Sequence, residues 1–212
     1  MKKFYLLLSS LVFVLSLSAQ DREIEENAPE IMEVISPDFD WENFDNKQAR
    51  CKFKKNVLEL ECFKKNQHAC THTELDFDVS NSDFIICFQI DVEKLDDEHR
   101  VGIVYDFKNQ KNFHALCFGK KQYSLLCYEN GDNVVVKEGL YKLDNKKRLL
   151  ITLKKKGKRV EFYLGSKYFP LTTLKNCEIT NQSVGFYVEN ETKINITGLG
   201  YRVLLKKDVE EE

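Results

Sequence analysis

The sequence contains little glycine, proline and tryptophan. Only 9 glycines, 3 prolines and 1 tryptophan occur among its 212 residues. Glycine-rich phosphate-binding loops, nucleophile elbows and two-histidine zinc-protease helices each have a short recognisable motif, and the sequence contains none of them. We therefore expect no nucleotide cofactor, and no cofactor of another kind.

Long apolar runs are missing after residue 17, since no later run approaches the roughly 20 residues that a spanning helix needs. The first run differs. Met1-Lys2-Lys3 precedes an apolar stretch from Phe4 to Leu17, and Ser18-Ala19-Gln20 follows it. This order is typical of a secretory signal peptide. We expect a signal peptide over residues 1–20, a secreted, periplasmic or cell-surface location, and no membrane span after cleavage.

A large net charge is also missing, because the formal value is only −2. The charges are nevertheless segregated: ten acidic residues and one arginine lie from Asp21 to Asp45, and eight basic residues without an acid lie from Lys146 to Arg159. We interpret residues 21–37 as an acidic arm, 38–205 as one domain and 206–212 as a charged tail. The basic stretch could bind an anionic glycan or a membrane surface, could dock the acidic arm, or could simply aid solubility. We expect no nucleic-acid partner.

Cysteine is comparatively frequent for an exported chain of this size. An odd count leaves at least one thiol unpaired, and three cysteines lie inside apolar strand patterns, where cysteine also serves as a small buried side chain. We expect one disulfide, with three disulfides as the alternative and the pairing open. The seven cysteines are Cys51, Cys62, Cys70, Cys87, Cys117, Cys127 and Cys177.

Short segments with a two-residue hydrophobic period recur about every ten residues. Eleven such segments predict strands at 57–63, 74–79, 84–92, 101–107, 112–118, 123–128, 134–137, 149–153, 160–164, 184–188 and 194–204. Turn-forming residues separate neighbouring segments at Gly119–Lys121, Asn130–Asp132 and Lys155–Lys158. This spacing indicates an all-β sandwich or barrel with little helix.

Two adjacent segments carry a resemblance to a known family. Gly102-Ile103-Val104-Tyr105-Asp106-Phe107, followed by Asn112-Phe113-His114, resembles the middle strands of concanavalin A-like lectin/glucanase domains, including laminin G-like versions. The resemblance continues through Tyr123–Gly131, Leu149–Gly165 and Val184–Val188. It implies an antiparallel two-sheet jelly-roll sandwich, whose concave outer face or loop rim is available for ligands. Glycans are a common ligand class in this superfamily.

Glycanases of that superfamily use acidic residues that alternate on one strand. Glu74, Asp76 and Asp78 would share a face of the predicted strand at 74–79, near the ~5 to 5.5 Å separation that retaining hydrolysis requires. These three acidic residues depart from the glucanase pattern, because the third of them is an aspartate. We expect a solvated strand face and no enzyme activity, with a glycanase as the remaining alternative.

His68, Cys70 and His72 place two imidazoles and a thiol within five residues. These groups can bind zinc, but the sequence gives no clear further ligand. We expect a polar loop and no metal site.

Sugar binding needs rings that stack on a pyranose and polar groups that bind its hydroxyls. Strand alternation places Ile103, Tyr105 and Phe107 on one face and Asp106 on the other. We therefore expect only one of Tyr105 and Asp106 to face a ligand. The candidate ligand-binding residues are Tyr105, Asp106, Asn112, His114, Tyr128 and Trp41.

Together these features predict an exported, non-catalytic binding module with a glycan as its ligand. The alternative is a structural domain that docks an envelope protein partner in a cell-envelope assembly.

Overall fold

A computed structural model describes residues 39–54, 57–92, 98–141, 148–165 and 169–204. The expected signal peptide, acidic arm and charged tail lie outside these residues. No helix occurs in the described ranges, and accordingly none of them contains a helix that could cross a membrane.

The described chain forms fourteen strands. In chain order they are β1 (Phe44–Asp45), β2 (Ala49–Lys54), β3 (Val57–Cys62), β4 (His68–Glu74), β5 (Asp83–Val92), β6 (Val101–Asn109), β7 (Asn112–Phe118), β8 (Gln122–Glu129), β9 (Asp132–Leu140), β10 (Arg148–Lys156), β11 (Arg159–Leu164), β12 (Thr172–Leu174), β13 (Ser183–Glu189) and β14 (Lys193–Leu204).

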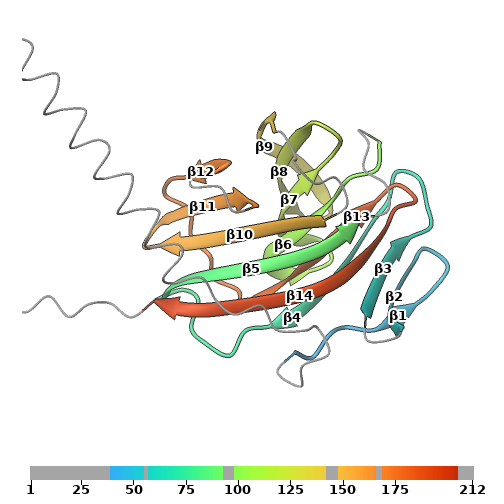
Figure 1. The fold of residues 1–212 in the computed structure, drawn as a ribbon, viewed down its shortest axis with the longest axis horizontal. Coiled ribbons are helices and arrows are strands. Elements are labelled where there is room, and N and C mark those ends of the chain that lie inside the picture. The colour runs from blue at the N-terminus through green and yellow to red at the C-terminus, as the bar shows by residue number, and fades with distance from the viewer. Residues whose placement is uncertain (1–38, 55–56, 93–97, 142–147, 166–168, 205–212) are drawn as a thin grey trace, which may run out of the picture.

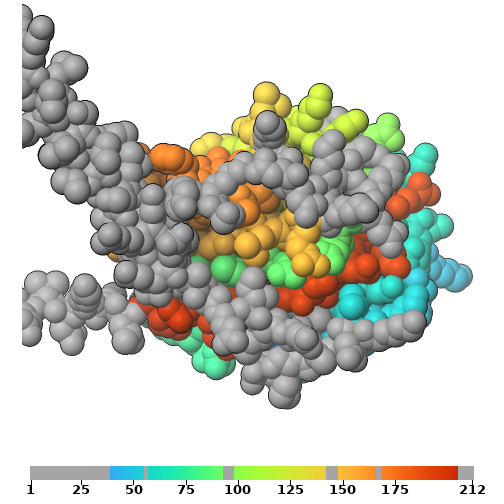
Figure 2. All heavy atoms as spheres, in the orientation of Figure 1, coloured from blue at the N-terminus to red at the C-terminus, as the bar shows by residue number. Residues whose placement is uncertain are grey.

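The strands form two antiparallel sheets. The eight-stranded sheet has the order β1-β2-β3-β14-β5-β10-β11-β12, and the six-stranded sheet has the order β4-β13-β6-β7-β8-β9. In Figure 1 the long strands β14, β5 and β10 of the larger sheet lie in front of the smaller sheet. Figure 2 shows the larger sheet's side of the molecule, with the yellow-green hairpins of the smaller sheet projecting at the top. The predicted antiparallel sandwich is confirmed.

Alternating apolar residues of both sheets fill the space between them. In β10, Leu149, Ile151 and Leu153 are completely buried, and they face the equally buried Ile103 and Phe186 of the smaller sheet within one core. Each such side chain contributes roughly 1.5–3 kcal/mol through burial. The two-residue period that predicted the strands is therefore the pattern that builds the core.

The sequence predictions fail at two neighbouring places. Residues 68–72, expected to form a polar loop, belong to β4, and the strand predicted at 74–79 is wrong because β4 ends at Glu74. Asp78 explains the break, since its carboxylate accepts hydrogen bonds from the backbone N–H groups of Ser80 and Asn81 and stabilises a turn. Strands β1, β2 and β12 were not predicted.

The seven cysteines are all described, and all are free thiols. The expected disulfide is therefore absent from the structure. Cys51, Cys62, Cys70, Cys87 and Cys117 are buried, so cysteine acts here mainly as a small hydrophobic side chain.

The expected alternation in β6 is interrupted at Asp106. This residue has φ of 50°, and the register with both neighbouring strands shifts around it. The bulge reverses the sidedness of the strand. Tyr105 therefore belongs to the core between the sheets, whereas Phe107 lies in a cluster on the outer face of the smaller sheet, contrary to the prediction that both share one face.

Candidate functional site

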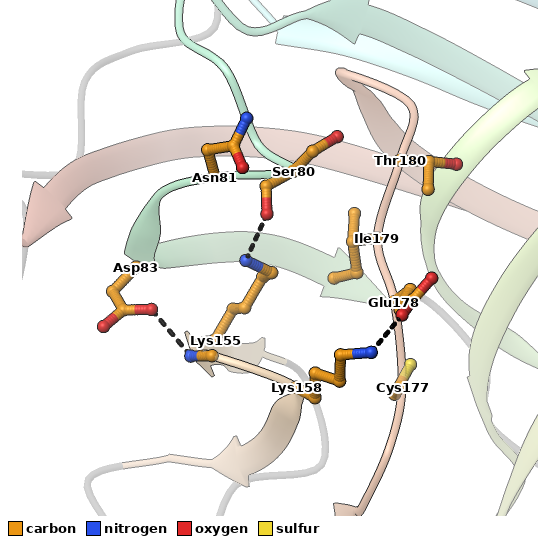
Figure 3. Close-up of a pocket in the computed structure, with 10 residues that line it drawn as sticks. Ser80, Asn81, Asp83, Lys155, Lys158, Cys177, Glu178, Ile179 and Thr180 are labelled. Carbon is orange, nitrogen blue, oxygen red and sulfur yellow. Dashed lines mark hydrogen bonds and ion pairs between the residues drawn. The ribbon is translucent and has the colours of Figure 1, made fainter.

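Two cavities lie along residues 174–180, the end of β12 and the connection that leads toward β13. The first has a volume of about 360 Å³ and is lined by Ser80, Asn81, Asp83, Lys155, Gly157, Lys158, Cys177, Glu178, Ile179 and Thr180 (Figure 3). The second has a volume of about 220 Å³ and is lined by Tyr105, His114, Leu126, Cys127, Val136, Leu174, Lys175, Asn176 and Cys177. Cys177 belongs to both, and we call the two cavities together the rim groove.

Asp106 anchors the segment that walls the rim groove. Its Oδ1 accepts hydrogen bonds from the backbone N–H groups of Thr180 (2.8 Å) and Asn181 (2.7 Å) and from both of their side chains. The bulge in β6 directs this carboxylate toward the connection. Asp106, predicted as a ligand-binding residue, is therefore an anchor of the groove wall.

The other end of the connection is tied to the β10–β11 hairpin. Cys177 N–H donates to the carbonyl of Lys158 (2.9 Å), and Lys158 Nζ forms an ion pair with Glu178 (2.5 Å). In Figure 3 this pair lies at the edge of the first cavity. The Lys158 ammonium lowers the pKa of Glu178, so this carboxylate is ionised at neutral pH.

Lys155 lies deeper in the first cavity. It continues the inward-facing row of Leu149, Ile151 and Leu153 along β10, and it is only 3% exposed. Its Nζ donates to the carbonyls of Ser82 (2.8 Å) and Ser80 (3.2 Å) in the β4–β5 loop. A charged side chain thus occupies the last core-facing position of the strand.

The second cavity contains two residues of the predicted set. Tyr105 lies at its base, is 2% exposed, and has a pKa raised well above its usual value by burial. The His114 ring lies 5.3 Å from the Tyr105 ring, and its Nδ1 lies 3.9 Å from Asp106 Oδ2. His114 Nδ1 is buried and makes no hydrogen bond. His114 is partly exposed and can therefore present its ring to a molecule in the groove.

Tyr128 lies elsewhere, in an aromatic cluster on the outer face of the smaller sheet. Its ring stacks on Phe113 at 4.2 Å and contacts His68 at 4.8 Å, and its hydroxyl lies 3.0 Å from that of Tyr187. Burial raises the pKa of Tyr128 to about 12. Tyr128 and Tyr187 are 4% and 0% exposed, so neither of these two rings is free to stack on a sugar.

The possible zinc ligands contribute to the same outer face. Cys70 is buried in the aromatic cluster, and the His72 ring stacks on Phe107 at 4.3 Å. The His72 Nε2 lies 3.3 Å from Glu42 Oε2. Among the residues that the structure describes, no three His, Cys, Asp or Glu side chains are grouped to hold a metal ion.

The remaining two predicted ligand residues lie apart from the groove cavities. Trp41 is 3% exposed and packs on Phe39 and Phe186, where it covers the core. Asn112 joins two hairpins, since its Oδ1 accepts from the backbone N–H of Asn130 and its Nδ2 donates to Asn109. Both are engaged within the protein.

The acidic row does not form the arrangement predicted for it. Glu74 ends β4, and Asp76 and Asp78 lie in the following loop. Asp76 accepts a hydrogen bond from Tyr201 Oη (2.7 Å), and Asp78 is used in its own turn. The three carboxylates therefore do not share a strand face.

Sequence reasoning singled out the basic stretch that contributes Lys155, Gly157 and Lys158 to the groove, but it missed the other walls. The connection at 175–182 has no periodic pattern, and the β4–β5 loop was assigned to a strand. One signal was available: Lys155 occupies the core-facing position of a regular alternation, which is unusual for a charged residue.

No protein-family model matches the sequence, and no curated protein matches it. Solved structures do match. The carbohydrate-binding module CBM66 from Bacillus subtilis aligns with a TM-score of 0.55 at 13% identity, over 76% of this chain and 94% of that one. A protein of unknown function with a galectin-like fold, also from Bacillus subtilis, aligns with a TM-score of 0.54 at 11% identity, over 84% and 100%. The chain has a lectin-like β-sandwich fold.

An enzyme is also among the similar structures. Xylan beta-1,4-xylosidase from Bacillus halodurans aligns with a TM-score of 0.58 at 10% identity, over 83% of this chain. The chain spans only 39% of that enzyme's length. Likenesses at such low identity establish the fold alone.

Proposed function

We propose that this protein is an exported, non-catalytic module that binds a glycan in the rim groove. The observation that carries the proposal is the groove itself, because it combines hydroxyl, amide and imidazole groups with apolar side chains at the edge of a lectin-like sandwich. Ser80, Asn176 and His114 offer hydrogen-bonding groups, and Ile179 and Leu174 offer apolar surface. Small-molecule sites combine these two kinds of group. CBM66, which shares the fold, is a carbohydrate-binding module.

The carboxylates of the groove support a binding role over hydrolysis. Glycosidases need one carboxylic acid with a raised pKa as the proton donor. In the first cavity the pKa of Glu178 is lowered by Lys158, and Asp83 accepts a hydrogen bond from Gly157 N–H at 2.7 Å. Both carboxylates are engaged as acceptors.

A second candidate function, docking of an envelope protein partner, has support from β9. This strand ends the smaller sheet, and among the described strands it pairs only with β8. Val134, Val135 and Val136 are 65%, 49% and 55% exposed. An apolar edge strand can add a strand from another chain.

A glycan array combined with a reducing-end assay separates the three functions. The glycan-binding proposal predicts that the purified domain is retained by a subset of neutral or acidic oligosaccharides and releases no reducing ends from them. Retention by none of them would contradict the proposal and favour docking. Hydrolysis would favour a glycanase.

A further inference from the structure

Lys155 is a charged side chain in the interior of the sandwich, at the inner wall of the first cavity. The residue as a whole is only 3% exposed. Moving a charge out of water costs several kcal/mol unless hydrogen bonds and an opposite charge compensate it. The contacts of Lys155 therefore show which hydrogen bonds and opposite charges its ammonium group has within the protein.

The contacts of Lys155 compensate only part of the cost of burying its charge. The Nζ donates to the carbonyls of Ser82 and Ser80 and lies 5.6 Å from the centre of the Phe84 ring. No carboxylate forms an ion pair with it within the described part of the chain. An ammonium group has three N–H donors, so the described residues leave one of them for an occupant of the cavity that Lys155 lines.

The other charged groups of the cavity already have partners. Lys158 and Glu178 neutralise each other, and Asp83 accepts from the Gly157 N–H on the hairpin (Figure 3). Lys155 is the cation of this lining that forms no ion pair with a carboxylate of the described residues. Figure 3 shows its side chain running between the β4–β5 loop and the 177–180 segment, which together bound the space next to it.

We infer that the first cavity binds an anionic group of the ligand, a carboxylate or a sulfate ester on a sugar, through Lys155 with Lys158 at the rim. The inference rests on the proposed glycan-binding function and narrows it to acidic saccharides. An oxygen of the anion would accept the third N–H of Lys155 and complete its coordination. A charge-assisted hydrogen bond of this kind is stronger than a neutral one.

Titration with sodium D-glucuronate and with D-glucose tests the inference, because these sugars differ at one carboxylate. At low salt we expect glucuronate to bind about tenfold more tightly than glucose, as one hydrogen bond to a charged group allows. We expect Lys155→Met to abolish this difference, so that the variant binds glucuronate no more tightly than glucose. Lys121→Gln, an exposed lysine in the β7–β8 turn, is the control and should keep the difference.

Two surface variants keep the inference testable if Lys155→Met does not fold. Glu178→Gln frees Lys158 from its ion pair, and we expect it to raise the affinity for glucuronate several-fold, in keeping with the usual strength of exposed charge pairs. Lys158→Gln should lower that affinity by a similar factor. Neither change should alter the affinity for glucose. An unchanged affinity for glucuronate in both variants would count against the inference.

The outcomes separate this inference from the proposed function. Equal affinities for glucuronate and glucose would overturn the anion site while leaving glycan binding intact. If sodium sulfate alone binds as tightly as glucuronate, with the same dependence on Lys155, the anion site stands and its assignment to a sugar is overturned. Failure of both sugars and of every array saccharide would overturn both claims.

Discussion

The Oδ1 of Asp106 lies 2.7 Å from the backbone N of Asn181, 75 residues later in the chain. This contact joins the bulge of β6 to the connection that walls the rim groove. Because the same oxygen accepts three further hydrogen bonds from residues 180 and 181, Asp106 determines the position of the wall.

Replacement of Asp106 should therefore destabilise the domain and disturb the groove. We expect Asp106→Ala to lower the free energy of unfolding by roughly 2–4 kcal/mol, from the lost hydrogen bonds and the cost of a left-handed conformation for alanine. Asp106→Asn should cost less, because asparagine tolerates φ of 50° and keeps an acceptor oxygen. Urea denaturation measures both, with the exposed Lys108→Ala as the control. Equal costs for alanine and asparagine would contradict this explanation.

Gly185 should not tolerate a side chain. A Cβ at this position of β13 would lie 1.9 Å from the carbonyl oxygen of Thr71 in β4. The neighbouring backbone cannot move away without breaking the ladder, so we expect Gly185→Ala to cost at least about 2 kcal/mol or to prevent folding. Gly157→Ala, in the open hairpin turn, is the comparison: its Cβ would meet nothing within 4 Å, and its φ of 57° should cost only about 1–2 kcal/mol. A milder effect at Gly185 than at Gly157 would contradict the packing described.

His68 should make stability depend on pH. Burial among aromatic rings lowers the pKa of His68 below the usual histidine value of 6.5. The unfolded chain therefore binds more protons than the folded one between the folded pKa and 6.5. The stability from neutral His68 is present above about pH 6.5 and is lost as the pH falls toward the folded pKa. We expect His68→Phe to reduce the loss of unfolding free energy between pH 7.5 and 5.5; an unchanged loss would count against burial of a neutral ring.

The thiols should differ in reactivity according to burial. Burial raises the pKa of Cys51 to about 11 and that of Cys70 and Cys117 well above 9. Since the thiolate is the reactive form, these cysteines should resist N-ethylmaleimide in the native protein, and the partly exposed Cys127 and Cys177 should react first. Peptide mass spectrometry identifies the labelled sites. Seven labels after denaturation without reductant are expected, and fewer would indicate a disulfide.

The sequence predicts the sandwich well because its core depends on a repeated local pattern. Leu149, Ile151 and Leu153 occupy every second position of their segment, and Asn130-Gly131 marks the turn of a hairpin. The groove depends instead on contacts between distant segments. The reversal at Asp106 arises from a bulge that alternation cannot reveal, and burial of Tyr128 arises from rings contributed by β4, β7 and β13. Of the six predicted ligand residues, Tyr105 and His114 line the groove, and Asp106 supports it.

The most direct test of the central claim is calorimetric titration with the array saccharide that is retained most strongly, comparing wild type with Ser80→Trp. Ser80 is exposed at the first cavity, and a tryptophan there would fill its entrance. Lys121→Trp places the same ring on the β7–β8 turn as the control. We predict that Ser80→Trp lowers the affinity at least tenfold, about 1.4 kcal/mol, and that Lys121→Trp leaves it unchanged. Wild-type affinity in Ser80→Trp would contradict binding in the rim groove.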